Sequence, residues 1–211
     1  AGSNANSYLL KLLDESGATV NELIVGKQSK DAFGASRNGT FVRKPGDELT
    51  WLVNAALEAK SDIKAWVKPR IYETPVNKIR KIRVETPGEE AYDIAWDVGA
   101  KRHKLAEVPK GKRVKYVNAA DDVAESISNF DLDDVRKVSS GAAGDPVATA
   151  TVEIDGGLKV TFKSRKTSDG DWLTLTATGE GEPKKFADDL TAAVKDWEFK
   201  LPFGKAAEVF K

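Results

Sequence analysis

The chain has 211 residues, of which 40% are hydrophobic and 31% are charged, and its formal net charge is zero. This composition is typical of a globular protein rather than a disordered chain, and no apolar run approaches the roughly 20 residues of a membrane-spanning helix. With no Cys and one His, the sequence excludes disulfides, thiolate metal sites, a cysteine nucleophile and His-pair metal sites.

Short strands dominate the first part of the chain. The expected strands, each an apolar or alternating run bounded by turn residues, are 8–13, 20–25, 39–43 and 49–53. The turn between the last two, Lys44-Pro45-Gly46-Asp47, has Pro second and Gly third, as a type II turn prefers, because Gly takes a positive φ without steric cost. We therefore expect a β-hairpin followed by two further strands.

The Gly26-Lys27 pair after the second strand invites comparison with a phosphate-binding loop. That motif needs Gly five positions before the Gly-Lys pair and Ser or Thr directly after the Lys. Asn21 and Gln28 stand at those positions, and loop-like residues follow in place of a helix. We therefore interpret Gly26 as the point where the chain leaves the sheet, with Lys27 facing solvent.

Three helices are predicted, over 54–67, 118–130 and 184–197. The first is rich in helix formers, and Asp62 can cap its last turns. The apolar residues of the second recur at spacings of four and three: Val123, Ile127 and Phe130. Those of the third recur at spacings of four, four and three: Phe186, Leu190, Val194 and Trp197.

Further strands are expected from about Val76 onward. The run 79–84 leads to a Pro87-Gly88 turn, and the returning strand has alternate apolar residues on one buried face: Tyr92, Ile94, Trp96 and Val98. A hairpin over 147–166 and a strand over 172–178 repeat the pattern of residues 8–26 and 40–53. The sequence therefore predicts an α+β fold of mostly antiparallel sheets in two related sub-blocks, with helices packed on one face. The first, 6–75, is the C-terminal half of a β-rich block, and the second is 76–211.

Charge is unevenly distributed along the chain. Residues 60–116 hold 15 Lys and Arg against 8 Asp and Glu, whereas residues 117–183 hold 6 against 13. The basic clusters at 101–104 and 110–115 are of the kind that meets phosphate or an anionic envelope surface, or else they are solvated strand ends that the acidic half neutralises. Nucleic-acid binding is not expected, because Tyr116 alone provides no stacking platform. If it occurs through 101–116, it must depend steeply on salt.

The sequence matches none of the catalytic motifs that we considered. His103 is the single histidine, and the neighbouring cations should lower its pKa, so we expect an ordinary surface histidine. There is no G-x-S-x-G nucleophile elbow. The carboxylate cluster at 131–134 is expected at a helix end, and the one at 169–171 in a turn between strands. We assign no catalytic, cofactor-binding or metal-ligating residue, and no cofactor.

The five tryptophans are expected to pack in the core, because large aromatic side chains bury most of their surface. They are Trp51, Trp66, Trp96, Trp172 and Trp197. A sugar-stacking face needs two or three of them exposed together.

Several segments together resemble the bacterial Domain of Unknown Function 4340 family. They are 22–27, 39–43, 50–53, 66–71, 131–136, 157–161 and 172–176. The resemblance covers nearly all of residues 8–200. It implies a body outside the cytoplasm, periplasmic and tethered to the inner membrane by an N-terminal anchor that this sequence lacks, so we expect the soluble C-terminal part of such a protein. Some members resemble components encoded beside gliding-motility ABC exporters.

The sequence thus favours a non-catalytic extracytoplasmic binding or scaffold module. Its expected partner is an envelope protein, with no nucleic acid, and it is accessory to an ABC-type export or gliding-motility-like complex. The alternative is a carboxylate-dependent hydrolase of envelope glycan. A cleft with two facing carboxylates and exposed Trp residues favours the hydrolase, and a flat apolar or charged patch favours the binding module.

Overall fold

The structure is a computed structural model that describes residues 6–60, 62–108, 110–138 and 148–210. It divides into two compact units, Ala1–Ser61 and Asp62–Lys211. The boundary expected at 75/76 falls inside the second unit, because strand β5 (Arg70–Glu73) pairs with strand β9 (Asn129–Asp131).

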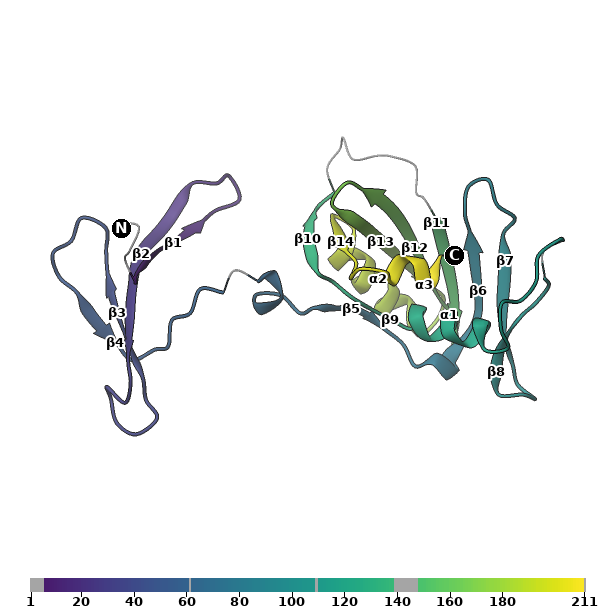
Figure 1. Cartoon of the computed structure of the whole chain (residues 1–211), viewed down its shortest axis with the longest axis horizontal. Coiled ribbons are helices and arrows are strands. Elements are labelled where there is room, and N and C mark those ends of the chain that lie inside the picture. Colours follow the sequence, from purple (N-terminus) through teal and green to yellow (C-terminus); the bar gives the residue numbers. More distant parts are fainter. Residues whose placement is uncertain (1–5, 61, 109, 139–147, 211) are drawn as a thin grey trace. The chain divides into compact units, whose positions relative to one another are not determined.

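The first unit is a four-stranded antiparallel sheet with the strands in sequence order (Figure 1). Its strands are β1 (Tyr8–Leu13), β2 (Thr19–Ser29), β3 (Gly39–Arg43) and β4 (Trp51–Val53). The predicted hairpin and third and fourth strands are confirmed. In the turn before β4, Asp47 N–H donates to the Lys44 carbonyl at 3.1 Å and Gly46 has a φ of 79°.

Strand β2 continues through the Gly26-Lys27 pair to Ser29, so the interpretation that the chain leaves the sheet at Gly26 is wrong. The pairing with β3 instead shifts register between Val25 and Gln28, as at a β-bulge. A Cβ at Gly26 would lie 3.2 Å from the Phe41 carbonyl oxygen, so the close approach of β3 explains the glycine. Lys27 is exposed.

The second unit is built on an eight-stranded antiparallel sheet of order β10-β14-β13-β12-β11-β6-β7-β8 (Figure 1). Its strands are β6 (Ile79–Glu85), β7 (Tyr92–Asp97), β8 (Arg102–Leu105), β10 (Asp134–Lys137), β11 (Ala148–Ile154), β12 (Leu158–Thr167), β13 (Gly170–Gly179) and β14 (Trp197–Lys200). The hairpin expected over 147–166 is confirmed as β11 and β12, although residue 147 itself lies outside the described residues.

One face of this sheet supplies the core. Along β11, every second residue is buried, and the buried positions pair with buried residues of β6 and β12: Ala150 lies opposite Val84 and Phe162. Buried residues of helices α1 (Ala119–Ile127), α2 (Pro183–Val194) and α3 (Lys205–Val209) join the same cluster, among them Ala124 and Ala187. The chain is thus α+β, with mostly antiparallel strands and few helices.

The helices over 118–130 and 184–197 are confirmed in shorter form, since Phe130 lies in β9 and Trp197 in β14. The helix expected over 54–67 is wrong. The described part of that segment contains only a 3-10 turn, η1 (Ile63–Ala65), which Asp62 caps by accepting a hydrogen bond from Lys64 N–H. A second such turn, η2 (Val76–Lys78), leads into β6.

Candidate interaction surfaces

Both faces of the first unit's sheet carry apolar side chains. Cross-strand partners share a face, and one such row crosses all four strands: Tyr8, Val25, Val42 and Trp51. Apolar side chains of the opposite face include Leu9, Ile24, Phe41 and Leu52. Strands that are apolar on both faces are typical of a sheet buried between two layers.

Little of this apolar surface is covered within the unit. Among residues 6–60, Val25 and Val42 are the buried apolar side chains, whereas Leu12 is 55% exposed, Leu13 58% and Trp51 60%. A globular unit needs a buried apolar core to offset the entropy that folding costs. Most of the apolar surface of this sheet is therefore left exposed.

The segment after β4 covers one end of the sheet. The Tyr8 hydroxyl donates to the Leu57 carbonyl at 3.1 Å and accepts from Ala59 N–H at 3.0 Å. The Thr40 hydroxyl donates to the Ala55 carbonyl at 2.6 Å. These contacts hold the segment at the Tyr8 end of β1, away from Leu12 and the end of the hairpin.

Strand β1 forms an edge of this sheet and pairs only with β2 among the described strands. Its sequence, YLLKLL, has one charged residue, Lys11, whose Nζ lies 3.5 Å from Glu22 of β2. Natural edge strands usually carry charge, proline or a bulge that prevents further pairing. β1 has two of these features, the ion-paired Lys11 and a register shift against β2 between Leu12 and Leu13. The rest of its edge is apolar and suited to the addition of another strand.

Two of the cavities in the second unit share a wall, because Glu89, Glu90 and Tyr92 line both of them. The first has a volume of about 300 Å³ and is also lined by Lys166, Asp171 and Phe210, among other residues. The second, of about 260 Å³, lies between β7, β8, the segment 112–115 and α1. Burial raises the pKa of the Tyr92 hydroxyl, and the nearby Glu89 carboxylate acts in the same direction.

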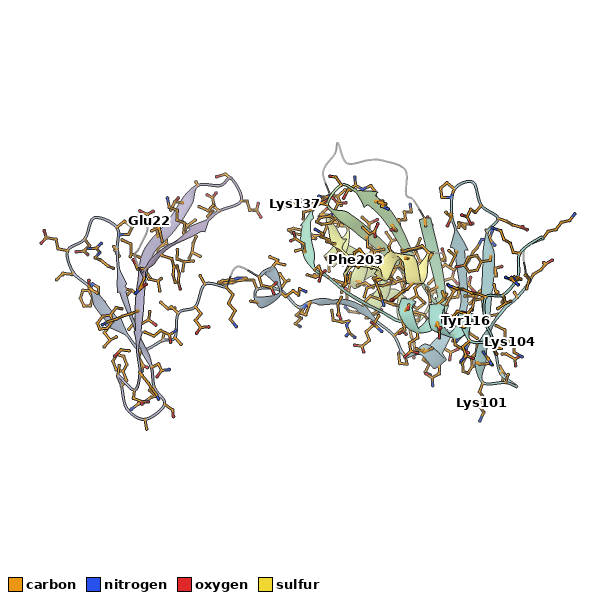
Figure 2. All side chains as sticks on the ribbon, viewed as in Figure 1. Glu22, Lys101, Lys104, Tyr116, Lys137 and Phe203 are labelled. Atoms are coloured by element: carbon orange, nitrogen blue, oxygen red, sulfur yellow. The ribbon has the colours of Figure 1, made fainter. Side chains whose placement is uncertain are left out.

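The basic stretch 101–116 divides into a paired and an unpaired part. Arg102 lies 2.8 Å from Asp121 of the acidic half, as expected for a neutralised strand end, whereas Lys104 lies 2.7 Å from Asp97 of the basic half. Figure 2 labels Lys101 and Lys104 near β8, with Tyr116 beside α1. Lys112, Arg113 and Lys115, by contrast, make no ion pair with any described residue and line the second cavity.

His103 lies on β8 with only 1% of its surface exposed, so the expectation of a surface histidine is wrong. Its Nε2 lies 3.1 Å from the Ile79 carbonyl oxygen. Burial lowers the pKa of the His103 imidazole and Arg80 adds to the shift, whereas the Ile79 carbonyl and Asp121 oppose it. The expected direction of the pKa shift is confirmed, but its main cause is burial.

The tryptophans do not share one core. Trp172 is buried, Trp96 is half-buried, and the expectation of core packing is wrong for Trp51, Trp66 and Trp197, which are exposed. Trp51 belongs to the first unit and the other four to the second.

The carboxylate clusters are tied to cations. Asp131 lies 2.5 Å from Arg70, and Asp133 lies 2.7 Å from Lys64. Asp131 is the last residue of β9, Asp133 lies between the two strands and Asp134 begins β10, so the expectation that these acids end a helix is wrong. Of the acids at 169–171, Asp169 lies in the turn between β12 and β13 and Asp171 lies in β13, and the Asp169 carboxylate accepts a hydrogen bond from Trp172 Nε1 at 3.1 Å.

A buried charge cluster that the sequence did not reveal lies on the sheet face opposite the core. Glu198 is buried and accepts hydrogen bonds from Arg136, at 2.5 Å, and from Arg165. The Arg136 guanidinium also lies 3.6 Å from the Trp172 ring centroid. The one signal in the sequence is Glu198 between two aromatic residues of a strand, in a position that a paired acid occupies.

The described part of the chain contains neither a metal-ligand cluster nor a membrane-spanning helix. No group of three or more His, Asp or Glu side chains there could hold a metal ion. No helix there combines the length and the apolar character needed to cross a bilayer.

The comparisons with known proteins bear on the family. No curated protein and no solved structure matches the chain. The family model described as domain of unknown function (DUF4340) matches residues 4–153, which include the whole of the first unit's sheet and the second unit as far as β11. This match spans more than half of the chain and confirms the expected family, although it ends before the segments 157–161 and 172–176 that also carried the resemblance. The protein belongs to the Domain of Unknown Function 4340 family.

Proposed function

We propose that this protein is a non-catalytic binding module that docks an envelope protein through the sheet of its first unit. In this proposal it works outside the cytoplasm, tethered to the inner membrane in its full-length form, as an accessory of an ABC-type export or gliding-motility-like complex. The observation that carries the proposal is the apolar sheet of the first unit, with Leu12, Leu13 and Trp51 more than half exposed.

The second unit suggests what kind of element the partner supplies. There, the outer edge of β11 pairs with β6, which contributes the buried residues Ile79, Ile82 and Val84. We propose that the two units are related sub-blocks, and that helices on one face of the sheet provide the covering layer in the second. The outer edge of β1 then accepts an antiparallel strand with apolar side chains at alternate positions.

A photo-crosslinking residue at the docking edge tests this function. Benzoylphenylalanine replaces Leu12 in the full-length protein, which is irradiated in its own membranes before the adduct is identified. We expect one specific envelope protein, captured through Leu12 and not through Thr176, an exposed control position on β13. Absence of a specific adduct, or the same adduct from both positions, would contradict the proposal.

A pair of charged substitutions tests the role of the edge itself. Leu12→Lys with Leu13→Lys gives β1 the charge that natural edge strands use against pairing. Both side chains are mostly exposed, so the double variant should fold as the parent does. We expect it to lose the specific partner from co-purification. Unchanged capture would show that the partner binds elsewhere.

One observation supports the second candidate, a hydrolase of envelope glycan. Three carboxylate residues, Glu89, Glu90 and Asp171, line the cavity of about 300 Å³, although no Trp lines it. Paired carboxylates are the groups that glycoside hydrolysis requires. Release of reducing ends from purified envelope glycan, abolished by Asp171→Asn, would establish this function in place of the first.

A further inference from the structure

We propose that the cavity between β7, β8, the segment 112–115 and α1 binds a single-chain amphiphile with an anionic head group. This site lies in the second unit and is independent of the docking sheet. Its volume of about 260 Å³ is slightly below the pockets of about 300 Å³ and more that hold small ligands, which suits one alkyl chain and not a two-chain lipid.

The floor and one wall of the cavity are apolar. Ile94 and Ala120 are buried, and Tyr92, Leu105 and Val123 are half-buried side chains that pack against the core cluster. Part of the core is therefore exposed to the cavity. An alkyl chain bound there would cover these apolar side chains and remove their surface from water.

The segment opposite the floor supplies the charge that selects the head group. Lys112, Arg113 and Lys115 line the cavity within four positions of each other, and they make no ion pair with the described residues. These cations are therefore available to bind a carboxylate or phosphate head group. Val114, between them, adds an apolar contact to the same wall.

Two acids set the orientation of the ligand. Glu89 and Glu90 of the β6–β7 turn also line the cavity and make no ion pair with described residues. They disfavour an anionic head on their side, so the head lies at Lys112–Lys115 and the chain extends over Tyr92 and Ile94. Removing these acids should therefore strengthen the binding of an anionic ligand, whereas removing the cations should weaken it.

The test is a titration of the whole chain with alkyl carboxylates, followed by calorimetry and by amide NMR shifts. Octanoate, decanoate and dodecanoate are the probes, and affinity should rise about tenfold for each added pair of methylenes that is buried. The shifts should concentrate at residues 89–94, 105 and 112–123. Absence of chain-length dependence, or shifts centred elsewhere, would overturn the proposal.

Head-group chemistry is tested with two further probes. Dodecyl maltoside has the chain without the charge, and inorganic phosphate has the charge without the chain. Both should bind at least tenfold more weakly than dodecanoate. Equal binding of the maltoside would refute an anion site, and phosphate as tight as dodecanoate would refute an amphiphile site.

Matched variants test which charged residues contribute to ligand binding. Lys112→Gln, Arg113→Gln and Lys115→Gln together should weaken dodecanoate binding about tenfold, the effect of three partly screened charges. A control triple variant, Lys44→Gln, Lys68→Gln and Lys163→Gln, has the same net charge and should bind as the parent does. Glu89→Gln with Glu90→Gln should tighten binding a few-fold. Equal losses in the two triple variants would contradict the site, because net charge alone would then explain them.

Discussion

Glu198 is a buried carboxylate that depends on its neighbours. Its side chain is 3% exposed and lies between the guanidinium groups of Arg136 and Arg165. A buried ion pair adds little net stability compared with apolar residues, but removing one partner leaves uncompensated charge behind. The cation–π interaction of Arg136 with the Trp172 ring also stabilises the position of the guanidinium.

Replacement of this carboxylate should be costly. Glu198→Ala removes the acid that Arg136 and Arg165 share and should lower the free energy of unfolding by about 1–3 kcal/mol, as measured by urea denaturation. The cost stays below that of a fully buried unpaired charge, because Arg136 is 39% exposed and lies 3.7 Å from Asp169. The control is Glu153→Ala, because Glu153 forms an exposed pair with Lys159 and should change stability by about 0.5 kcal/mol or less. Equal effects would show that Glu198 is not held as described.

The buried imidazole of His103 should make stability depend on pH. Burial lowers the folded pKa below the unfolded value of 6.5, so the unfolded chain binds a proton more readily. Its contribution is fully present above pH 6.5 and is lost as pH falls from there toward the folded pKa. We expect the urea midpoint to fall between pH 7 and pH 5.5, and His103→Gln to reduce that fall. An unchanged slope would contradict this account.

At the scale of elements, aromatic side chains fasten the β5–β9 ribbon to the main sheet. Tyr72 of β5 and Phe130 of β9 lie 4.9 Å and 4.8 Å from the Phe162 ring of β12, centroid to centroid. All three side chains are buried. The ribbon connects segments about 60 residues apart, so this contact closes a long loop of the chain.

Truncation of the shared ring should loosen the ribbon. Phe162→Ala leaves a cavity at the centre of the cluster and should cost about 3–5 kcal/mol of unfolding free energy. Phe186→Ala on α2 removes the same atoms from a side chain that is 56% exposed, so it should cost far less. Thermal or urea denaturation of both variants measures the difference, and similar losses would contradict the packing described.

Sequence patterns identified most elements but not their limits. The alternation of apolar residues located β1, β3, β6, β7 and β12, because side-chain period in a strand is a local property. The helix formers of 54–60 were misleading, since backbone groups of this segment bond to the hydroxyls of Tyr8 and Thr40, which are distant in sequence. Phe186 fitted a helical stripe yet is exposed. The docking sheet and the cavities could not be predicted, because they depend on which apolar surfaces the tertiary packing leaves exposed. The local periodicity of apolar residues carries no information about that packing.

At the scale of the whole molecule, the two units differ in how much core each has. The core cluster draws on β6, β7, β11, β12, β13 and three helices, and among the described residues it includes no side chain of the first unit. Hydrophobic burial is the dominant favourable term in folding. The first unit should therefore be much less stable by itself than the second.

Hydrogen exchange should reveal this difference directly. In the free chain, backbone amides of β1 and β2 should exchange roughly a hundredfold or more faster than those of β12 and β13, because local opening needs less free energy where few apolar contacts are broken. Binding of the proposed partner should slow exchange in the first unit alone. Equal exchange rates in the two units of the free chain would contradict the expectation that the first unit is less stable.

Because the tryptophans differ in exposure, their intrinsic fluorescence can report partner binding. Trp172 is buried beneath the Arg136 guanidinium, whereas Trp51 stands on the open sheet of the first unit. Excited indole emits at longer wavelength in water than in a dry interior, so the two side chains contribute to opposite ends of the emission band. A partner that covers the open sheet should shift the Trp51 component to the blue without disturbing the Trp172 component, and the complex can then be followed with no attached dye.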